Sequence, residues 1–503
     1  MDISFIDHFY RVCNQYPDKQ AIVDVDRSIS YSDLKTEIEN CTLGLHKRGV
    51  KKGDRVSIYM DNSIEFVIIL YSIMSVGGVA VMLNSAANFS DVENWVKHSG
   101  SSWLFVKKLQ EEFFAIRDNL TSDLQLVSLE VSGIGLDTLV FSDLLKEANG
   151  DVYKENIAPD DAAVIIYTSG TTGDPKGVTL THKNLLSNYK AIVRYLELTS
   201  NDSIVCVLPF YYSYGSSVLN THLMVGGTVI LENNFMYPSL SMQKIEKYGV
   251  TGFSGVPSTF ILLLKKVNFN DYDLSTLRYV TQAGGALPVT YIDQLQQALV
   301  NSKIIIMYGQ TEASARLTYL PPEKLTKKIG SVGIAIDGVS IQIRNENGMS
   351  VDPGETGEVY ASGENIMSGY WENNEATEKT IVNGWLKTGD LGYVDKDGYL
   401  YLEGRKSEMI KVGGNRIAPG EIEEVLSEID NISEVAVVGI SDELLGQIIK
   451  AVVVLSDGAE LNAMQIKAYC KSKLATYKIP KYIEFVDSLP KTASGKIKRF
   501  KLV

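Results

Sequence analysis

Five short apolar runs between residues 202 and 312 constrain the fold most, and three of them have glycine or hydroxyl residues at or near their carboxyl ends. The runs are DSIVCVLPF (202–210), TVILE (228–232), GFSGVPS (252–258), LRYVTQAGG (277–285) and KIIIMYGQTE (303–312). Earlier, the helical pattern of residues 31–49 precedes the strand pattern DRVSIYM (54–60). Such alternation predicts α/β layers with parallel strands, and ligand sites gather beyond the carboxyl ends of those strands.

Residues 66–83 carry no charge across eighteen positions, which reaches the lower limit for a membrane-spanning helix. The pair Gly77–Gly78 interrupts this run, and the VAVML that follows is β-branched like a buried strand. We therefore predict a buried helix, a glycine turn and a strand. The N-terminal residues MDISFIDHFY have no basic region of a secretory signal, so we expect a cytoplasmic protein.

The pattern of helix, strand and turn signals changes twice along the 503 residues. From about 330 the chain is rich in turns and strand patterns, with a hairpin signal at Asp397–Gly398. After Arg405 a compact α+β pattern begins. We predict an N-terminal core of stacked α/β layers over 1–405, with a β-rich subdomain at about 330–405. A small mobile α+β domain is expected over 406–503.

The charge balance excludes one class of partner. With 48 basic and 61 acidic residues, the formal net charge is −13, so the basic footprint of a nucleic-acid-binding protein is missing. The four cysteines and five histidines are scattered without zinc-site spacing. We expect neither a structural metal nor a nucleic-acid partner.

The segment YTSGTTGDPKGVT (167–179) combines three glycines, several hydroxyl residues and one lysine. Glycines let backbone amides approach an anion, and hydroxyl groups and a lysine add donors and charge. The spacing differs from a Walker A loop, which needs GxxxxGK[ST]. Composition alone leaves two interpretations open, a phosphate-binding loop or a solvated surface loop. We expect a strand before this loop and a helix that begins near Thr181.

Residues 167–178 resemble the signature loop of the acyl-adenylate-forming superfamily, which includes acyl-CoA synthetases, adenylation domains and beetle luciferases. Three further motifs follow in the family's order: MYGQTE (307–312), WLKTGDLGYVDKDGYLYLEGR (385–405) and PKTASGKIKR (490–499). The resemblance covers nearly the whole chain. It implies an ATP-dependent, AMP-forming ligase that activates a carboxylic acid as an acyl-adenylate and transfers the acyl group to a thiol.

The resemblance also implies a nucleotide site. Glu312 matches the family's magnesium-binding acid, Thr311 faces the α-phosphate and Tyr308 lies near adenine. Asp390 and Arg405 match ribose-binding residues, since a carboxylate can accept from both ribose hydroxyls. The residues expected to complete the ATP site are Thr168, Ser169, Gly170, Thr171, Thr172, Gly173, Lys176, Gly284, Gly285, Ala286, Gly309 and Gln310.

Lys496 matches the family's lysine that reaches the substrate carboxylate and the α-phosphate, where a cation offsets repulsion between two anions. Its basic neighbours Lys491, Lys498 and Arg499 are expected to be solvated. The family turns its small C-terminal domain between the two reactions. The residues implied in the second reaction are Lys411 as a catalytic lysine, Gly413, Gly414 and Arg416 along the thiol tunnel, and Ser407 at the hinge, with Lys406 or Glu408 as alternative pivots.

The acid pocket is expected to be lined by Tyr212, Ser216, Gly255, Gln282 and Ala313. Tyrosine stands where amino-acid adenylation domains carry an aspartate for the substrate ammonium, and an ammonium without a counter-charge is costly to bury. The tyrosines predict an aryl or short-to-medium acid, unless they are simply part of the core.

The thiol acceptor is not decided by the sequence. We expect no fused carrier domain, because FVDSLPKT (485–492) lacks the glycine of a phosphopantetheine site. The acceptor is therefore coenzyme A or a separate carrier protein. Three alternatives remain open: a stand-alone amino-acid adenylation enzyme, a luciferase-like monooxygenase and a catalytically silent nucleotide-binding module.

Overall fold

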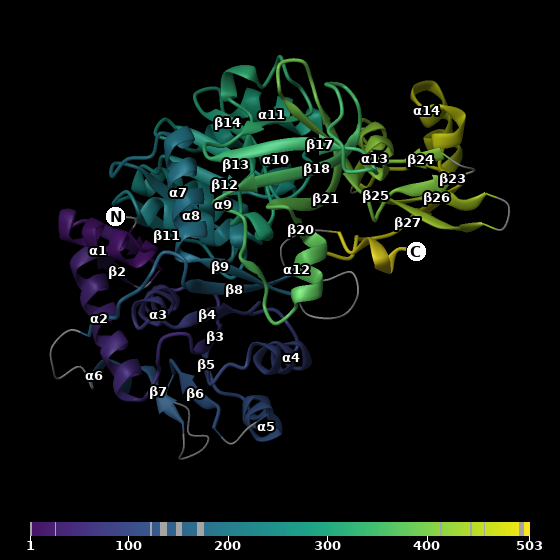
Figure 1. Ribbon diagram of the computed structural model, residues 1–503. Helices are drawn as coiled ribbons and strands as arrows, with labels where there is room; N and C mark the ends of the chain where they lie inside the picture. The colour runs from purple at the N-terminus through teal and green to yellow at the C-terminus, as the bar shows by residue number, and fades with distance from the viewer. Residues whose placement is uncertain are drawn as a thin grey trace.

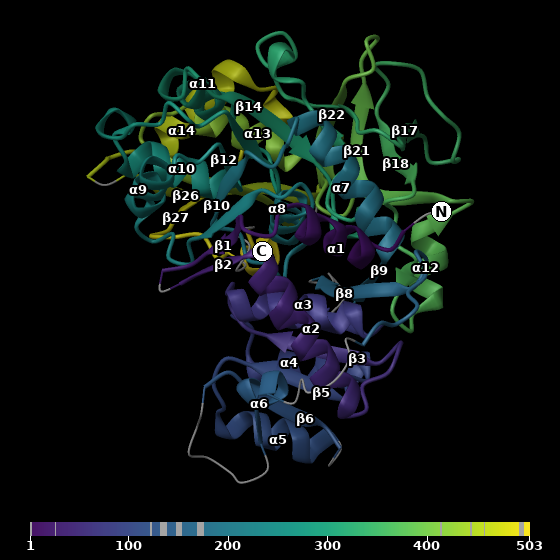
Figure 2. The ribbon, with the colours of Figure 1, turned by 90° about the vertical axis from the view of Figure 1, so that its left-hand side faces the viewer.

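The computed structural model describes most of the chain. The described residues are 3–25, 27–120, 123–130, 138–146, 153–168, 176–412, 415–442, 445–456, 458–491 and 497–503. Within them, two large sheets are stacked with helices between them and on both outer faces, and a smaller sheet forms near the C-terminus (Figure 1). Figure 2 shows the sheet with β3 and β5 at the lower end and the sheet with β12 and β14 above it.

The lower sheet has the strand order β19-β9-β8-β4-β3-β5-β6-β7. Its strands from β8 to β7 run parallel, whereas β9 and β19 are antiparallel additions at one edge. The strands are β3 (Arg55–Tyr59), β4 (Val79–Met82), β5 (Trp103–Val106), β6 (Gln125–Ser128), β7 (Leu139–Val140), β8 (Ala162–Thr168), β9 (Lys176–Thr181) and β19 (Gly369–Tyr370). Helices α4 (Phe89–Ser99) and α5 (Glu111–Leu120) pack on its outer face.

The upper sheet has a parallel centre formed by β10 (Ser203–Cys206), β11 (Thr228–Leu231), β12 (Gly252–Gly255), β13 (Tyr279–Gln282) and β14 (Lys303–Tyr308). At one edge it gains β1 (Gln20–Val23) and β2 (Ser28–Ser30). The helices α9 (Pro238–Tyr248), α10 (Pro257–Lys266) and α11 (Val289–Ala298) cover its outer face.

The β-rich region expected from about 330 continues this sheet at its other edge. Strand β14 pairs antiparallel with β15, and β15 pairs with β16, so the two regions share one hydrogen-bonded ladder. The added strands are β15 (Thr318–Tyr319), β16 (Ser331–Ala335), β17 (Val339–Arg344), β18 (Gly357–Gly363), β20 (Ile381–Val382), β21 (Trp385–Val394) and β22 (Leu400–Arg405). The predicted hairpin around Asp397–Gly398 is confirmed, because β21 and β22 pair across it. Helix α12 (Asn374–Thr380) lies in the same region.

The layer between the two sheets forms the main core. It contains helices α1 (Phe5–Gln15), α2 (Tyr31–Lys47), α3 (Ile64–Ser75), α6 (Phe141–Lys146), α7 (His182–Leu196) and α8 (Ser213–Leu223). Every residue of α3 except Glu65 is buried, which explains its apolar character on all sides. The predicted helix, turn and strand are confirmed by α3, Gly77 at φ +79° and β4. No helix in the described part of the chain is long and apolar enough to cross a membrane.

The segment after the glycine-hydroxyl loop differs from the expectation. The sequence predicted a direct passage from loop to helix, but residues KGVTLT form β9, which returns antiparallel to β8 with Thr168 opposite Lys176. Alternating β-branched residues explain this strand, which a helix prediction overlooked. Helix α7 then begins where predicted, because the Thr181 hydroxyl accepts a hydrogen bond from the backbone amide of Asn184 at 3.1 Å. The loop therefore connects two paired strands.

The C-terminal residues form a separate sheet at the right of Figure 1. Its elements are β23 (Ile410–Val412), β24 (Asn415–Ile417), α13 (Pro419–Ser427), β25 (Ile432–Asp442), β26 (Gly446–Leu455), α14 (Ala463–Lys473) and β27 (Tyr482–Phe485). The helices pack on one face, and Leu489, Ile497 and Leu502 of the tail pack on the other. Ion pairing of Arg416 with Glu346 at 2.8 Å connects this unit to the preceding region.

Candidate active site

The carboxyl ends of parallel strands bring several predicted residues to one edge of the upper sheet. In the register of β12, β13 and β14, Gly255 is paired with Gln282, and Gln282 with Ile306. Tyr308 ends β14, and the short turn Thr311–Ala313 follows it directly. This is the edge at which ligand sites of α/β sheets form.

The first polar cluster joins Glu312 to the glycine-hydroxyl loop. The Tyr370 hydroxyl donates a 2.9 Å hydrogen bond to Glu312 Oε1, and Lys176 Nζ lies 5.5 Å from the centre of the Tyr370 ring. Tyr370 reaches this place because β19 pairs with β9, with Tyr370 opposite Val178. Thr311 lies beside it, with its hydroxyl 3.2 Å from that of Ser213 at the start of α8.

The second cluster consists of Asp390, Arg405 and Tyr308. Arg405 Nε lies 2.8 Å from Asp390 Oδ1, and the Tyr308 hydroxyl donates to Asp390 Oδ2 at 2.5 Å. The hairpin register places Asp390 opposite Arg405, so the two side chains meet by strand pairing. Burial raises the pKa of Tyr308 well above its usual value, and the Asp390 charge raises it further. Tyr308 is therefore a permanent hydrogen-bond donor to this carboxylate.

The two clusters are neighbours. Burial alone would lower the pKa of Arg405, but the charges of the Asp390 and Glu312 carboxylates outweigh burial and raise it. Burial raises the pKa of Tyr370, as does the charge of Glu312, while Arg405 opposes both effects. Arg405 therefore lies within electrostatic range of both clusters. Together they form one polar site built from β9, β14, β19 and the β21–β22 hairpin.

Glycines shape the backbone on either side of this site. Gly309 lies so close to the next segment that a Cβ atom would stand 2.0 Å from the Ala315 carbonyl oxygen, so only glycine fits. Gly284 has φ +89°, and the Gln282 amide donates to the Gly285 carbonyl at 2.8 Å. The predicted residues Gly284, Gly285 and Ala286 are exposed, and Gln310 is partly exposed.

Eight predicted residues lie outside the described residues. They are Ser169, Gly170, Thr171, Thr172, Gly173, Gly413, Gly414 and Lys496. The positions that flank them are described. Thr168 and Lys176 are paired across β8 and β9, and Ile497 forms an isolated bridge with Lys491.

The segments that contain the predicted acid-pocket residues converge on one cavity. Its wall is formed by sequence neighbours of those residues and not by the predicted residues themselves. The residues lining it are Ile192, Tyr195, Leu196, Tyr214, Ser217, Val218, Thr221, His222, Ser254, Thr281, Met307 and Arg316. The predicted Ser216, Gly255, Gln282 and Ala313 are each buried one to three positions from a lining residue, and Tyr212 is partly buried. Phe210 and Tyr211 belong to the core, as the alternative interpretation of these aromatic residues held.

Two site residues escaped the sequence analysis. Tyr370 lies in none of the four sequence motifs, and it reaches the site only because β19 pairs with the distant strand β9. Arg316 lies just beyond the MYGQTE motif, and an arginine in an otherwise small and apolar stretch, EASARL (312–317), was the available signal.

The residues implied in the second reaction lie in the C-terminal unit. Lys411 and Arg416 are paired opposite each other in β23 and β24, and both are exposed. Ser407 is exposed in the connecting turn. On either side of it, Lys406 pairs with Glu358 at 2.8 Å and Glu408 lies 3.2 Å from Arg499 Nε.

The expectation of merely solvated lysine and arginine neighbours of Lys496 was wrong for two of them. Lys491 pairs with Glu434 at 2.7 Å. Arg499 forms ion pairs with Glu423 and Glu408, and its side chain is only 23% exposed. The sequence could not show these partners, because they come from β25, α13 and the connecting turn. The tail that carries Lys496 is therefore anchored on the C-terminal unit.

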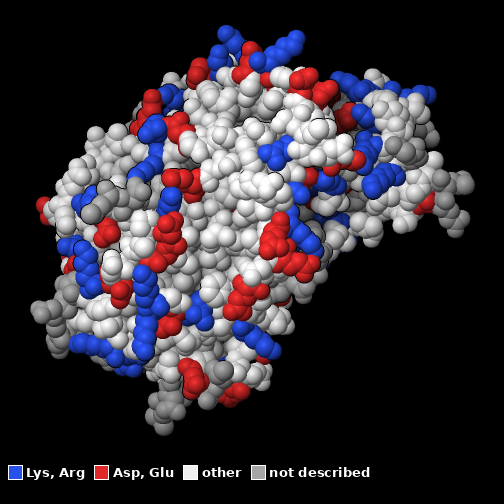
Figure 3. Space-filling view, viewed as in Figure 1, with Lys and Arg blue, Asp and Glu red and all other residues white. Residues whose placement is uncertain are grey.

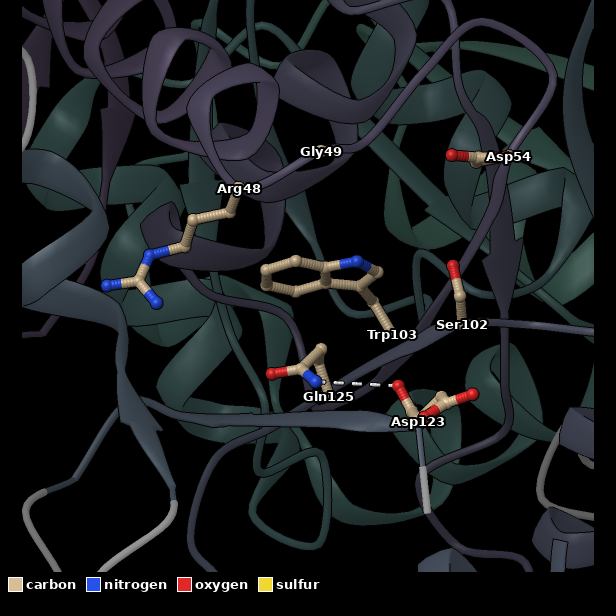
Figure 4. Close-up of a pocket in the computed structure, with 7 residues that line it drawn as sticks. All are labelled: Arg48, Gly49, Asp54, Ser102, Trp103, Asp123 and Gln125. Atoms are coloured by element: carbon tan, nitrogen blue, oxygen red, sulfur yellow. Dashed lines mark hydrogen bonds between the residues drawn. The ribbon is translucent and has the colours of Figure 1, made fainter. Parts of the chain in front are cut away.

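A larger hollow among the described residues lies elsewhere. It has a volume of about 580 Å³ and is lined by Arg48, Gly49, Asp54, Ser102, Trp103, Asp123 and Gln125 (Figure 4). These residues surround the amino ends of β3, β5 and β6, opposite to the edge where ligands of parallel sheets bind. We therefore place the candidate site at the carboxyl ends of the parallel strands.

Basic and acidic side chains are interspersed over the face in Figure 3, without a continuous basic area on that face.

The chain belongs to the AMP-binding enzyme family. The family model described as AMP-binding enzyme matches residues 9–371, and the one described as AMP-binding enzyme C-terminal domain matches residues 421–496. The predicted superfamily and ligase class are therefore confirmed, together with the large N-terminal and smaller C-terminal architecture.

Curated relatives and solved structures agree with this class. An indoleacetate–CoA ligase of Aromatoleum aromaticum is 33% identical, covering 96% of this chain and 94% of the relative. A long-chain-fatty-acid–CoA ligase of Bacillus subtilis is 32% identical, covering 97% and 92%. An anthranilate CoA ligase solved with anthranoyl-AMP has a TM-score of 0.90 and 28% identity, covering 99% and 96%.

A fourth similar protein was solved with ATP and magnesium. This o-succinylbenzoate coenzyme A synthetase of Bacillus subtilis has a TM-score of 0.87 and 29% identity, covering 98% of both chains. None of these four names contains a carrier protein, an amino-acid adenylation domain or a monooxygenase. They support the acid–thiol ligase and not the alternatives.

Proposed function

We propose that this protein joins a carboxylic acid to coenzyme A through an acyl-adenylate, at the site where Glu312, Tyr370 and Lys176 meet the Asp390–Arg405 pair. The observation that carries the proposal is this convergence. Three distant parts of the sequence supply the acid Glu312, the cation Lys176 and the carboxylate of Asp390, which is paired with Arg405. Lys176 directly follows the glycine-hydroxyl loop in the sequence. One nucleotide with its phosphates needs such a set of groups.

In the first reaction, an oxygen of the acid carboxylate attacks the α-phosphorus of ATP. The bond to the β-phosphate oxygen breaks, and pyrophosphate leaves. Both reactants are anions, so the transition state needs positive charge in fixed positions. Lys176 and the loop 169–175 bind the leaving pyrophosphate, while Lys496 neutralises the carboxylate and the α-phosphate. Asp390 and Arg405 hold the ribose, and Tyr308 supports Asp390 beside the adenine.

The donor set fits a magnesium ion held mainly by the substrate. Mg²⁺ prefers oxygen ligands and binds nucleotide phosphates with only one or two protein carboxylates. In the described part of the chain, no cluster of three or more histidine, cysteine, aspartate or glutamate side chains could hold a metal alone. Glu312 is the partly exposed carboxylate at the site and suits this role. When bound, the ion supplies positive charge to the phosphate oxygens.

In the second reaction, the thiolate sulfur attacks the acyl carbonyl carbon, and AMP leaves with the electrons of the carbon–oxygen bond. The thiol proton passes to the solvent. We propose that the domain over 406–503 rotates against residues 1–405 between the reactions, with the turn at 406–408 as hinge. Such a rotation must break the Lys406–Glu358 and Arg416–Glu346 pairs. The Arg416–Glu346 pair is exposed on both sides, and such surface pairs are weak, whereas Glu358 is only 15% exposed. Lys411, Gly413 and Gly414 then face the thiol.

Coenzyme A is the proposed acceptor, because every similar protein named above is a ligase or synthetase of coenzyme A thioesters. The test is a screen for acid-dependent conversion of ATP to AMP and pyrophosphate, followed by mass spectrometry of thioesters. Coenzyme A and a pantetheine-bearing carrier protein serve as parallel acceptors. We expect acyl-coenzyme A. Exclusive loading of the carrier protein would refute the acceptor, and absence of AMP formation with every acid would refute the function.

A further inference from the structure

The guanidinium of Arg316 is buried and has no acidic partner among the residues that the structure describes. Arg316 is only 2% exposed, and its Nε has no hydrogen-bond partner. None of the ion pairs found among the described residues includes it. Less buried arginines of this fold do have carboxylate partners: Arg278, with a 32% exposed side chain, lies 2.8 Å from Asp202, and Arg405, with a 42% exposed side chain, lies 2.8 Å from Asp390. A buried charge without a partner is strongly destabilising, so its retention needs a reason.

The groups around Arg316 are neutral. Its guanidinium lies 4.9 Å from the centre of the Tyr214 ring. Burial raises the pKa of Tyr195 to about 12, and nearby Arg316 opposes this rise without preventing it. Burial lowers the pKa of His222 to about 4, so this histidine carries no charge at neutral pH. Aromatic rings and hydroxyl groups attract a cation but do not cancel its charge.

The backbone holds Arg316 in place at a cost. Ser314 has φ +56° and Ala315 has φ +104°, left-handed conformations that are strained for residues with side chains. The Arg316 carbonyl accepts two hydrogen bonds, from the side-chain amides of Asn188 at 2.8 Å and Asn365 at 3.0 Å. Strain that persists because the surroundings enforce it is typical of functional segments.

Arg316 faces the cavity on which the acid-pocket segments converge. The cavity contains about 10 Å³ of free space, room for about one water molecule. Thr281 and Ser254 lie on one side of it, joined by a 2.7 Å hydrogen bond, and Met307 lies beside them. A methionine side chain is flexible and can move to admit the end of a substrate. The site therefore offers a desolvated cation, small hydroxyl groups and an adjustable wall.

We infer that Arg316 binds a second carboxylate of the substrate, so that the acid activated by this enzyme is a dicarboxylic acid. This inference rests on the proposed function, since one carboxylate reacts at the Lys496 end while the other pairs with Arg316. A planar guanidinium and a carboxylate form two parallel hydrogen bonds, which adds geometric selection to charge. The substrate supplies the counter-charge that the protein does not. An acid without the second carboxylate leaves the cation unpaired and is rejected.

The test compares acids that differ only in the distal group. Linear dicarboxylic acids of three to about eight carbons and the three benzenedicarboxylic acids are paired with monocarboxylic acids of equal carbon number. Acid-dependent pyrophosphate release gives kcat/KM for each member. We expect the best dicarboxylic acid to exceed its monocarboxylic partner by about 30-fold or more, the range measured when one member of a buried charge pair is removed.

Variants separate charge from folding. In Arg316→Met the preference should reverse, with a loss of about 30-fold or more for the dicarboxylic acid and a gain for its partner. Arg316→Lys should keep part of the preference, because lysine retains the positive charge but cannot form the two parallel hydrogen bonds of a guanidinium. Arg344→Met is the matched control, since Arg344 also lies over aromatic rings, 4.5 Å from that of Tyr360, but in the β-rich region. It should keep the wild-type preference.

The results that would refute the role of Arg316 differ from those that would refute the proposed ligase function. Activity with monocarboxylic acids alone, or equal losses for both acids in Arg316→Met, would overturn the role of Arg316 while leaving the ligase intact. Absence of AMP formation with every acid would overturn both. Melting temperatures of the variants exclude misfolding as the cause of a loss, and Arg316→Lys keeps the comparison informative if Arg316→Met fails to fold.

Discussion

Replacing Tyr370 by phenylalanine removes one contact of the site and leaves the rest in place. The hydroxyl donates a 2.9 Å hydrogen bond to Glu312, while the ring lies 5.5 Å from Lys176 Nζ. Phenylalanine keeps the ring and therefore most of the cation–π contact. The substitution isolates the positioning of the carboxylate that we assign to magnesium.

The expected effect follows from the kind of hydrogen bond that is lost. Hydrogen bonds to charged groups contribute about 1.5–3 kcal/mol when buried. Glu312 is partly exposed, so water replaces part of the interaction, and we expect a loss of about 1–2 kcal/mol. This corresponds to a decrease of roughly 5- to 30-fold in kcat/KM for magnesium-ATP. The pKa of Tyr370 is raised by burial, so the wild-type hydroxyl remains a donor across the neutral range.

The assay is pyrophosphate release measured over a series of magnesium concentrations. Tyr370→Phe should need more magnesium for half-maximal rate, a shift that a merely structural role would not produce. Tyr393→Phe is the control, because Tyr393 stacks on Tyr401 with ring centres 5.1 Å apart and lies outside the proposed site. Unchanged magnesium dependence in Tyr370→Phe, with Tyr393→Phe also unchanged, would refute the reasoning.

Three further predictions concern the tail, the tunnel and pH. Lys496→Ala should abolish adenylate formation while ATP binding remains; normal pyrophosphate exchange would contradict this role. Gly414→Phe should spare adenylation but slow thioester formation, and equal loss of both reactions would argue against the tunnel. Burial lowers the pKa of His182 to about 4, so only the unfolded state takes up its proton between pH 6.5 and 4. His182 should account for roughly 3 kcal/mol of stability that is present above pH 6.5 and is lost across that window, and His182→Leu should remove this share in melting experiments. Buried His222, whose pKa is also lowered to about 4, should retain its own share in that variant.

Local patterns determined much of the architecture. The uncharged run became α3, a glycine turn and β4, because the pair Gly77–Gly78 divides it into two short segments that are both buried. The hairpin at Asp397–Gly398 followed from its turn residues, and its register then placed Asp390 opposite Arg405. Motif order led to the family. The strand β9 was missed, since its residues were assigned to a loop and a helix cap.

The tertiary structure alone decided which residues complete the site. Tyr370 meets Glu312 only because β19 pairs with β9, nearly two hundred positions earlier in the chain. Arg499 looked like a solvated tail residue until Glu423 and Glu408 were found around it. Arg316 reads as an ordinary arginine in the sequence, and its significance lies in the absence of an acidic partner among the described residues. Sequence patterns report periodicity and spacing, whereas burial and charge pairing depend on contacts between segments far apart in the chain.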